Sequence, residues 1–204
     1  NYDYTVRNNK GKIVQFSYGD DCFDPIKVES QIIPIVQMTT EEIYGYFQIS
    51  LSNTTGKESI IQSIFIKSVQ NKYKQQKFLL NEKTKEYIDY MLVQKKLIIK
   101  NVFKNIHNKQ VYLPVAFTHI IQNIIGQQKL NINSQIDLTP LDAYEMIEKT
   151  YESLNTLNYA KPNELFKVMY YYYLSPKQLL IIKRFNRNAL TLLLETIVTS
   201  YKQA

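Results

Sequence analysis

Cysteine and tryptophan are almost missing from this sequence. The chain of 204 residues has one cysteine, Cys22, and no tryptophan. A single cysteine excludes an intrachain disulfide framework and a zinc site made of several cysteines, so we expect a reduced thiol in an intracellular protein. No stretch approaches the roughly eighteen apolar residues of a membrane-spanning helix, and the N-terminus has no signal-peptide pattern. We therefore expect no membrane among the partners of this chain.

Arginine is also scarce. Arg7, Arg184 and Arg187 are the only arginines among 25 basic residues, although the net charge is +7. Few bidentate forks for bases or phosphates are therefore available, and no recognised DNA- or RNA-binding signature is present. The excess charge fits solvated helix faces or an electropositive surface on a larger assembly. An independent basic nucleic-acid-binding protein stays open as an alternative, and it predicts strongly salt-dependent binding to DNA or RNA.

Near the N-terminus, residues 5–16 have the pattern of a β-hairpin. Two short stretches, 5–7 and 13–16, enclose a turn at 8–11 whose asparagines and glycine tolerate positive φ. The next motif, Tyr18-Gly19-Asp20-Asp21, admits a metal-dependent polymerase interpretation, because paired carboxylates at a tight turn can ligate Mg²⁺. That chemistry needs another carboxylate from a separate strand, and the residues before Tyr18 hold only one acid, Asp3.

The whole stretch 2–25, YDYTVRNNKGKIVQFSYGDDCFDP, resembles a segment of the largest subunit of multisubunit DNA-directed RNA polymerases of the RNA polymerase II type. Asp20 stands where that family has glutamate, and Cys22 where it has glycine. Residues 113–123, LPVAFTHIIQN, are similar to the LPVNI-x-RIIQNA pattern that opens a helix in the foot domain of that subunit. There, Ala116 replaces asparagine and His119 replaces arginine. A nuclear enzyme and a giant-virus enzyme fit equally, so the resemblance implies the nucleus, or a cytoplasmic virus factory or virion.

The resemblance implies a non-catalytic structural and docking role in transcription. In that family the aspartate-rich catalytic loop and the bridge helix lie upstream of such a segment, and the trigger loop lies downstream. The resemblance therefore implies no catalytic, cofactor-binding or metal-binding residue in this chain, although the parent enzyme, a nucleotidyltransferase, would use Mg and Zn. The implied partners are other RNA polymerase subunits and a capping enzyme or transcription factors, with nucleic acid reached only through the full complex.

The expected fold class is α+β and mainly α-helical, in three segments. Residues 1–30 are expected to form a β segment, 31–83 a variable mixed segment and 84–204 a helical, foot-like domain. In the middle segment, Pro34 interrupts an apolar extended run at 32–36 that suits an edge strand or a crossing segment. Thr40 precedes two acids and can cap a short helix, and residues 53–57 have the composition of a loop.

From Thr84 onward, apolar residues recur at spacings of three and four, as on one face of an amphipathic helix. That face is expected to hold Ile88, Met91, Leu92, Ile98, Ile99, Val102, Phe103 and Ile106. Lysines occupy the other side of the same helix. We expect a partner-facing strip there, or, as the alternative, an ordinary solvated face: Lys95, Lys96, Lys100 and Lys104.

Further helices have readable starts or ends. Phe117 opens the buried face of one helix, and Gly126 is expected to end it. Capping residues predict where three later helices begin: Thr139 before Pro140, Ser175 before Pro176, and Asn186. A further helix is expected to start at Asn163.

The helix expected over 163–174 carries four consecutive tyrosines, at 170–173. Four neighbouring residues point to all sides of a helix. We therefore expect some of these tyrosines to be exposed or docked against a partner.

Two sets of site residues follow from these motifs. The first is a structural turn fixed by hydrogen bonds or ion pairs: Arg7, Tyr18, Gly19, Asp20, Asp24 and Pro25. The second is the family-like helix start: Leu113, Pro114, Val115, Ile120, Ile121 and Asn123. His119 is expected to be packed or half-exposed rather than a ligand, and His107 has no carboxylate or thiol at metal-ligand spacing.

Overall fold

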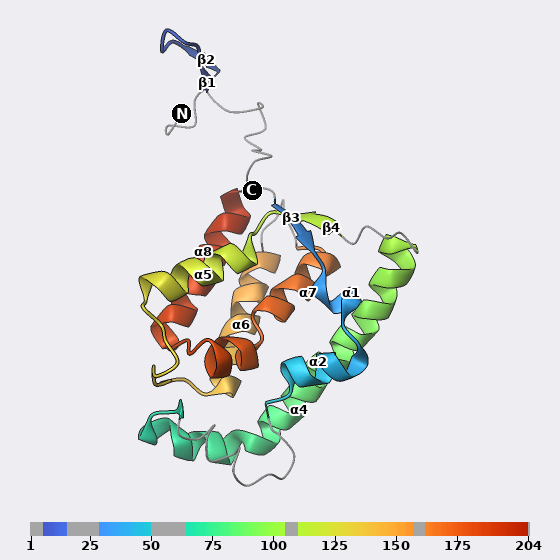
Figure 1. The fold of residues 1–204 in the computed structure, drawn as a ribbon, viewed down its shortest axis with the longest axis vertical. Coiled ribbons are helices and arrows are strands. Elements are labelled where there is room, and N and C mark those ends of the chain that lie inside the picture. Colours follow the sequence, from blue (N-terminus) through green and yellow to red (C-terminus); the bar gives the residue numbers. More distant parts are fainter. Residues whose placement is uncertain (1–5, 16–28, 50–63, 105–109, 157–161, 204) are drawn as a thin grey trace.

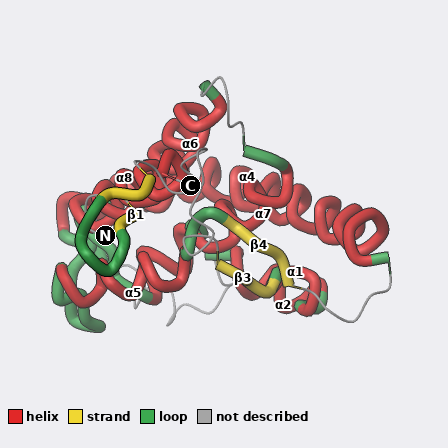
Figure 2. Tube along the Cα trace, turned by 90° about the horizontal axis from the view of Figure 1, so that it is seen from above, coloured by secondary structure: helices red, strands yellow, loops and turns green. Residues whose placement is uncertain are grey.

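The computed structural model describes residues 6–15, 29–49, 64–104, 110–156 and 162–203. Helices make up most of this part of the chain, and the strands form two separate two-stranded sheets (Figures 1 and 2). The fold is therefore mainly α-helical α+β, as predicted. None of the described helices has an apolar stretch that could cross a bilayer.

The first sheet is the predicted N-terminal hairpin. Strand β1 (Val6–Arg7) pairs antiparallel with β2 (Ile13–Gln15). The Asn8 side chain accepts hydrogen bonds from the backbone amides of Lys10 and Lys12, both at 3.0 Å, and Gly11 has a φ of 76°. Asparagine thus binds the turn backbone and glycine takes the left-handed conformation, as their chemistry favours.

The second sheet joins two segments that lie far apart in the sequence. Strand β3 (Glu29–Ile32) pairs antiparallel with β4 (Gln110–Leu113), with Glu29 opposite Leu113 and Ile32 opposite Gln110. The strand ends at Ile32, and Pro34 begins the short helix α1 (Pro34–Gln37). Proline is favoured at the first helical position because an amide there has no helical partner. The prediction of an extended segment was therefore wrong from Pro34 onward.

Helix α2 (Thr40–Phe47) follows α1 and begins with a capping box. The Thr39 hydroxyl accepts a hydrogen bond from the Glu42 amide at 3.2 Å, and the Glu42 carboxylate accepts one from the Thr39 amide at 2.7 Å. The cap is thus Thr39 rather than the predicted Thr40. Ile43 and Phe47 are fully buried, so α1 and α2, which we call the α1–α2 arm, pack into the main core.

Helix α4 (Lys67–Ile98) is the longest described helix and begins well before the predicted start at Thr84. Its first half is polar, and although Tyr73 and Leu80 are buried, Phe78 and Leu79 are exposed, so the helical periodicity is weak there. Figure 1 shows the helix curving along one side of the body. The buried Thr84 hydroxyl donates to the Leu80 carbonyl at 2.7 Å, a contact that bends helices. The expected boundary between residues 83 and 84 lies inside this helix, and the three-segment division stays a prediction.

Four further helices complete the body: α5 (Phe117–Gln127), α6 (Pro140–Asn155), α7 (Glu164–Tyr173) and α8 (Arg187–Gln203). Between α7 and α8, η3 (Lys177–Ile182) is a π-helical segment. The predicted caps Thr139 and Asn186 are confirmed, and Asn163, where a helix was expected to start, is a cap as well. The side chains of Thr139, Asn163 and Asn186 accept hydrogen bonds from amides three residues ahead, at 3.2, 2.7 and 2.8 Å.

The end of α5 and the expected helix start at Ser175 differ from the prediction. Gly126 lies inside α5, and Lys129, with a φ of 50°, takes the left-handed conformation just after the helix. The amides of Lys129 and Leu130 donate to the carbonyls of Gly126 and Ile125 at 3.3 and 3.1 Å, which are the paired bonds of a Schellman motif. Among the described residues, the buried Ser175 hydroxyl has no hydrogen-bond partner, so the expected capping box does not form.

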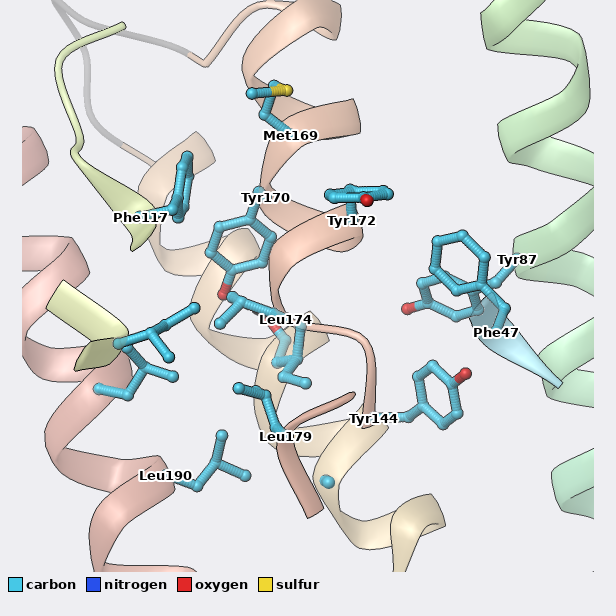
Figure 3. Close-up of a cluster of buried hydrophobic side chains, with 14 of the residues drawn as sticks. Phe47, Tyr87, Phe117, Tyr144, Met169, Tyr170, Tyr172, Leu174, Leu179 and Leu190 are labelled. Atoms are coloured by element: carbon cyan, nitrogen blue, oxygen red, sulfur yellow. Dashed lines mark hydrogen bonds between the residues drawn. The ribbon is translucent and has the colours of Figure 1, made fainter. Parts of the chain in front are cut away.

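Helix α7 lies inside the helical body, with Phe117 of α5 on one side and Phe47 and Tyr87 on the other (Figure 3). Phe117 stacks on Tyr173 with ring centroids 5.4 Å apart. Tyr87 meets Tyr171 edge to face at 5.1 Å. All four tyrosines at 170–173 are buried or half-buried. The prediction that some would be exposed or docked against a partner was wrong, because segments distant in the sequence cover them.

Candidate interaction surface

The C-terminal end of α4 positions the predicted lysine strip. The α-helix passes into a π-helical turn, η2 (Ile99–Phe103), and Lys104 ends it in the left-handed conformation with a φ of 38°. Ile98 and Phe103 are both buried, although residues five apart point to different sides of an α-helix. The i to i+5 pairing of a π turn reduces that difference, so both side chains reach the core and Lys100 between them stays outside.

Three of the four predicted lysines face solvent, and one does not. Lys96, Lys100 and Lys104 are exposed, whereas Lys95 is half-buried. The Lys95 ammonium donates a hydrogen bond to the carbonyl of Met38, directly after α1. Lys95 therefore fixes the α1–α2 arm to α4 rather than presenting a charge to a partner.

The exposed lysines surround a hollow and are interleaved with exposed aliphatic side chains. Lys96, Ile99, Lys100 and Lys104 line an open hollow of about 510 Å³. Val93 and Leu97, one helical turn apart, are 55% and 44% exposed. Single exposed apolar residues are ordinary, but contiguous ones mark interaction sites. We call this region the α4-end surface: Val93, Lys96, Leu97, Ile99, Lys100, Val102 and Lys104.

A second set of contacts fixes the α1–α2 arm at the C-terminal end of α2. The last carbonyls of a helix have no partner within the helix, and those of Gly45 and Tyr46 accept hydrogen bonds from the side chains of Lys177 and Gln178. A cation at a helix C-terminus also interacts favourably with the helix dipole. Burial lowers the pKa of Lys177. No local sequence signal indicates these contacts, because the partners are more than a hundred residues apart.

A third feature is a polar and aromatic notch where α4, α6 and α7 meet. Its volume is about 190 Å³, and Glu86, Tyr87, Tyr90, Glu148, Lys167 and Tyr171 line it. Glu148 accepts a hydrogen bond from the Tyr87 hydroxyl at 2.7 Å and forms an ion pair with Lys83 at 2.8 Å. Lys167 lies over the Tyr90 ring, 5.1 Å from its centroid. Through these contacts the notch joins three helices.

The family-like helix start forms the junction between β4 and α5. Leu113 and Val115 are buried, Pro114 is half-buried, and the Val115 carbonyl accepts a hydrogen bond from the Gln31 side chain at 2.7 Å. Further on, Ile120 and Ile121 are buried, whereas Asn123 is exposed. The motif thus attaches the β3–β4 sheet to the core through its apolar residues. His119 was expected to be packed or half-exposed, but it is exposed, because it lies with Thr118 on the solvent side of α5.

Of the predicted structural-turn residues, one lies within the described residues and the others lie outside them. Arg7 lies in β1. Tyr18, Gly19, Asp20, Asp24 and Pro25 lie outside the described residues, as does His107, so the roles expected for them stay predictions. Within the described ranges, no group of three or more histidine, cysteine, aspartate or glutamate side chains could hold a metal ion.

Comparison with known proteins assigns this helical body to a family. The model of the family described as RNA polymerase Rpb1, domain 6 matches residues 23–204. The chain therefore belongs to this family, whose members are parts of the largest subunit of DNA-directed RNA polymerases. The resemblance recognised in the sequence is confirmed at this level.

Curated relatives share short stretches with the chain. DNA-directed RNA polymerase III subunit RPC1 of Giardia intestinalis is 64% identical over 28 residues, which are 14% of this chain. The corresponding subunit of Dictyostelium discoideum is 56% identical over 34 residues, or 17% of this chain. Each match spans only 2% of the relative's length.

Proposed function

We propose that this chain is the foot region of the largest subunit of a DNA-directed RNA polymerase and serves transcription as a non-catalytic structural and docking module. The observation that carries the proposal is the construction of the helical body. The α1–α2 arm is fixed to α4 through Lys95 and to η3 through Lys177. One continuous core runs from Ile33 to Ile197. Such a body keeps its outer surfaces in fixed positions, as docking requires.

The proposed partners are other polymerase subunits and, on the outer surface, a capping enzyme or transcription factors. Nucleic acid would be reached only through the complete enzyme. We place Mg and Zn of that enzyme outside this chain. The setting is the nucleus, or a virus factory or virion if the polymerase is that of a giant virus.

A capture experiment tests the docking role. Tagged 1–204 is incubated with its native extract after nuclease treatment, and the bound proteins are identified by mass spectrometry. We expect polymerase subunits to be recovered. The matched control is Leu193→Asp, which places a charge at a fully buried core position and disrupts the fold. Recovery of no polymerase subunit by the folded chain would contradict the proposal.

The metal-dependent polymerase alternative is tested separately. The chain and the double variant Asp20→Asn, Asp21→Asn are assayed for template-directed nucleotide incorporation with Mg²⁺ or Mn²⁺. We expect neither protein to incorporate nucleotides. Activity of the natural chain that the double variant lacks would overturn the non-catalytic role.

A further inference from the structure

We propose that the α4-end surface binds an acidic protein segment that also carries apolar side chains. This inference rests on the proposed docking function and names the chemistry of the partner. It follows from the arrangement of charge and of exposed aliphatic groups on this surface.

The positive charge of the surface is not matched locally. Lys96, Lys100 and Lys104 line one hollow, and within the described part of the chain none of them forms an ion pair. Other lysines are paired: Lys72 with Asp142 and Lys83 with Glu148, each at 2.8 Å. The nearest acid before Lys96 on the same face of α4 is Asp89, two turns away, or about 10 Å along the helix axis. Three ammonium groups are therefore available to carboxylates from outside.

The apolar groups of the surface lie among these charges. Ile99 lines the hollow together with the lysines, and Val102 is 47% exposed. Val93 and Leu97 extend the aliphatic area along α4. A purely acidic segment would leave these groups in water, whereas a segment with both kinds of side chain would cover them and pair the lysines. Burial of aliphatic area contributes affinity in proportion to the area covered.

The same composition disfavours nucleic acid as the ligand. Proteins bind single-stranded nucleic acids by stacking the bases on aromatic side chains. They often bind the phosphates through bidentate hydrogen bonds from arginine. The α4-end surface contains no aromatic residue and no arginine. Its lysines can pair with carboxylates or with phosphates, but its aliphatic groups match apolar side chains rather than bases.

Binding is measured by fluorescence anisotropy with residues 1–204 and a labelled peptide of glutamate and leucine. Two further probes are a peptide of glutamate and serine and a single-stranded DNA of similar length. The test variant is Lys96→Glu, Lys100→Glu, Lys104→Glu. The matched control applies the same charge change to exposed lysines elsewhere: Lys74, Lys85 and Lys149. Circular dichroism checks that both variants are folded, and a Lys→Gln set at the same three positions replaces any variant that is not.

We expect the glutamate–leucine peptide to bind, and the test variant to weaken binding at least about tenfold while the control changes it less than about twofold. The double variant Ile99→Ser, Val102→Ser should weaken binding of the glutamate–leucine peptide several-fold. It should leave binding of the glutamate–serine peptide unchanged. Equal losses in test and control variants would overturn the inference, because net charge alone would then explain binding. Tighter binding of DNA than of the peptide would overturn it as well.

The result separates this inference from the proposed function. If polymerase subunits are captured from the extract but the glutamate–leucine peptide does not bind, the partner chemistry is wrong and the docking function stands. If the peptide binds at this surface but no polymerase subunit is captured, the docking function is wrong and the surface assignment stands.

Discussion

Tyr46 and Tyr172 stack face to face, with ring centroids 4.4 Å apart and an angle of 9° between their planes. The Tyr46 hydroxyl also donates a hydrogen bond to the Tyr172 carbonyl at 3.2 Å. The two residues are 126 positions apart in the sequence. One lies in the α1–α2 arm and the other in α7. This pair therefore links the arm directly to the buried tyrosine helix.

Substitution of Tyr46 tests that link. Tyr46→Phe removes the hydrogen bond and should cost about 1 kcal/mol of unfolding free energy. Tyr46→Ala also removes the stacked ring and should cost about 3 kcal/mol, measured by urea denaturation. The control is Tyr44→Ala, at an exposed position of the same helix, which should cost less than about 0.5 kcal/mol. Equal effects at positions 44 and 46 would show that the arm is not held by this pair.

The stability of the fold should fall at alkaline pH. Burial is the main cause that raises the pKa of tyrosines in the core, and Tyr144 and Tyr151 reach about 12. The pKa is raised in nine tyrosines: Tyr46, Tyr87, Tyr90, Tyr144, Tyr151, Tyr170, Tyr171, Tyr172 and Tyr201. A folded pKa above the unfolded value of 10.0 favours the neutral phenol in the folded state. The stabilisation is complete below pH 10 and is lost as the pH rises toward the folded values.

Two measurements check this pH dependence. Urea denaturation should give an unfolding free energy that falls steeply above about pH 10. Absorbance of the phenolate should show part of the tyrosines ionising late in the folded chain, and all of them near pH 10 in urea. Ionisation of every tyrosine near pH 10 in a chain that stays folded would contradict the described burial.

The parts of the fold that local chemistry determines could be predicted from the sequence. Thr139 and Asn163 cap helices because each is followed by a helical run whose amides their oxygens can reach. Ser175 has the same signature, but its surroundings bury it and the segment after it is π-helical. The start of α4 was missed because its first half buries few apolar residues. A cap motif or a periodicity is therefore informative only where neighbouring segments do not override it.

At the α4-end surface, too, local sequence patterns predicted only part of the arrangement. Helical spacing correctly placed Lys96 of α4 and Lys100 of η2 on the exposed side. The same spacing gave no warning that Lys95 binds the Met38 carbonyl, because 57 positions separate the two residues. For the same reason, some of the tyrosines at 170–173 were expected to be exposed or docked against a partner. Their neighbours come from α2, α4, α5 and α6, and this arrangement is tertiary information.

Lys129→Gly should stabilise the chain. Lys129 takes a left-handed conformation with a φ of 50°, which costs a residue with a Cβ atom about 1 kcal/mol and glycine almost nothing. We expect an increase of about 1 kcal/mol in unfolding free energy by urea denaturation. The control is Lys129→Ala, which keeps the Cβ atom and should change stability little. If both variants have the same stability, the backbone conformation is not the cause.

The last prediction concerns the contacts that Lys177 and Gln178 make with the end of α2. Lys177→Met with Gln178→Ala removes the donors to the Gly45 and Tyr46 carbonyls, so the last turn of α2 should open more often. Amide hydrogen exchange over residues 44–48 should accelerate about tenfold or more, since each lost hydrogen bond is worth about 1 kcal/mol. Exchange in α6 and α8 should stay unchanged. The matched control is Lys183→Met, because Lys183 is also half-buried with a lowered pKa. Faster exchange throughout the double variant, or the same local acceleration in the control, would show that the arm is not fixed through these two side chains.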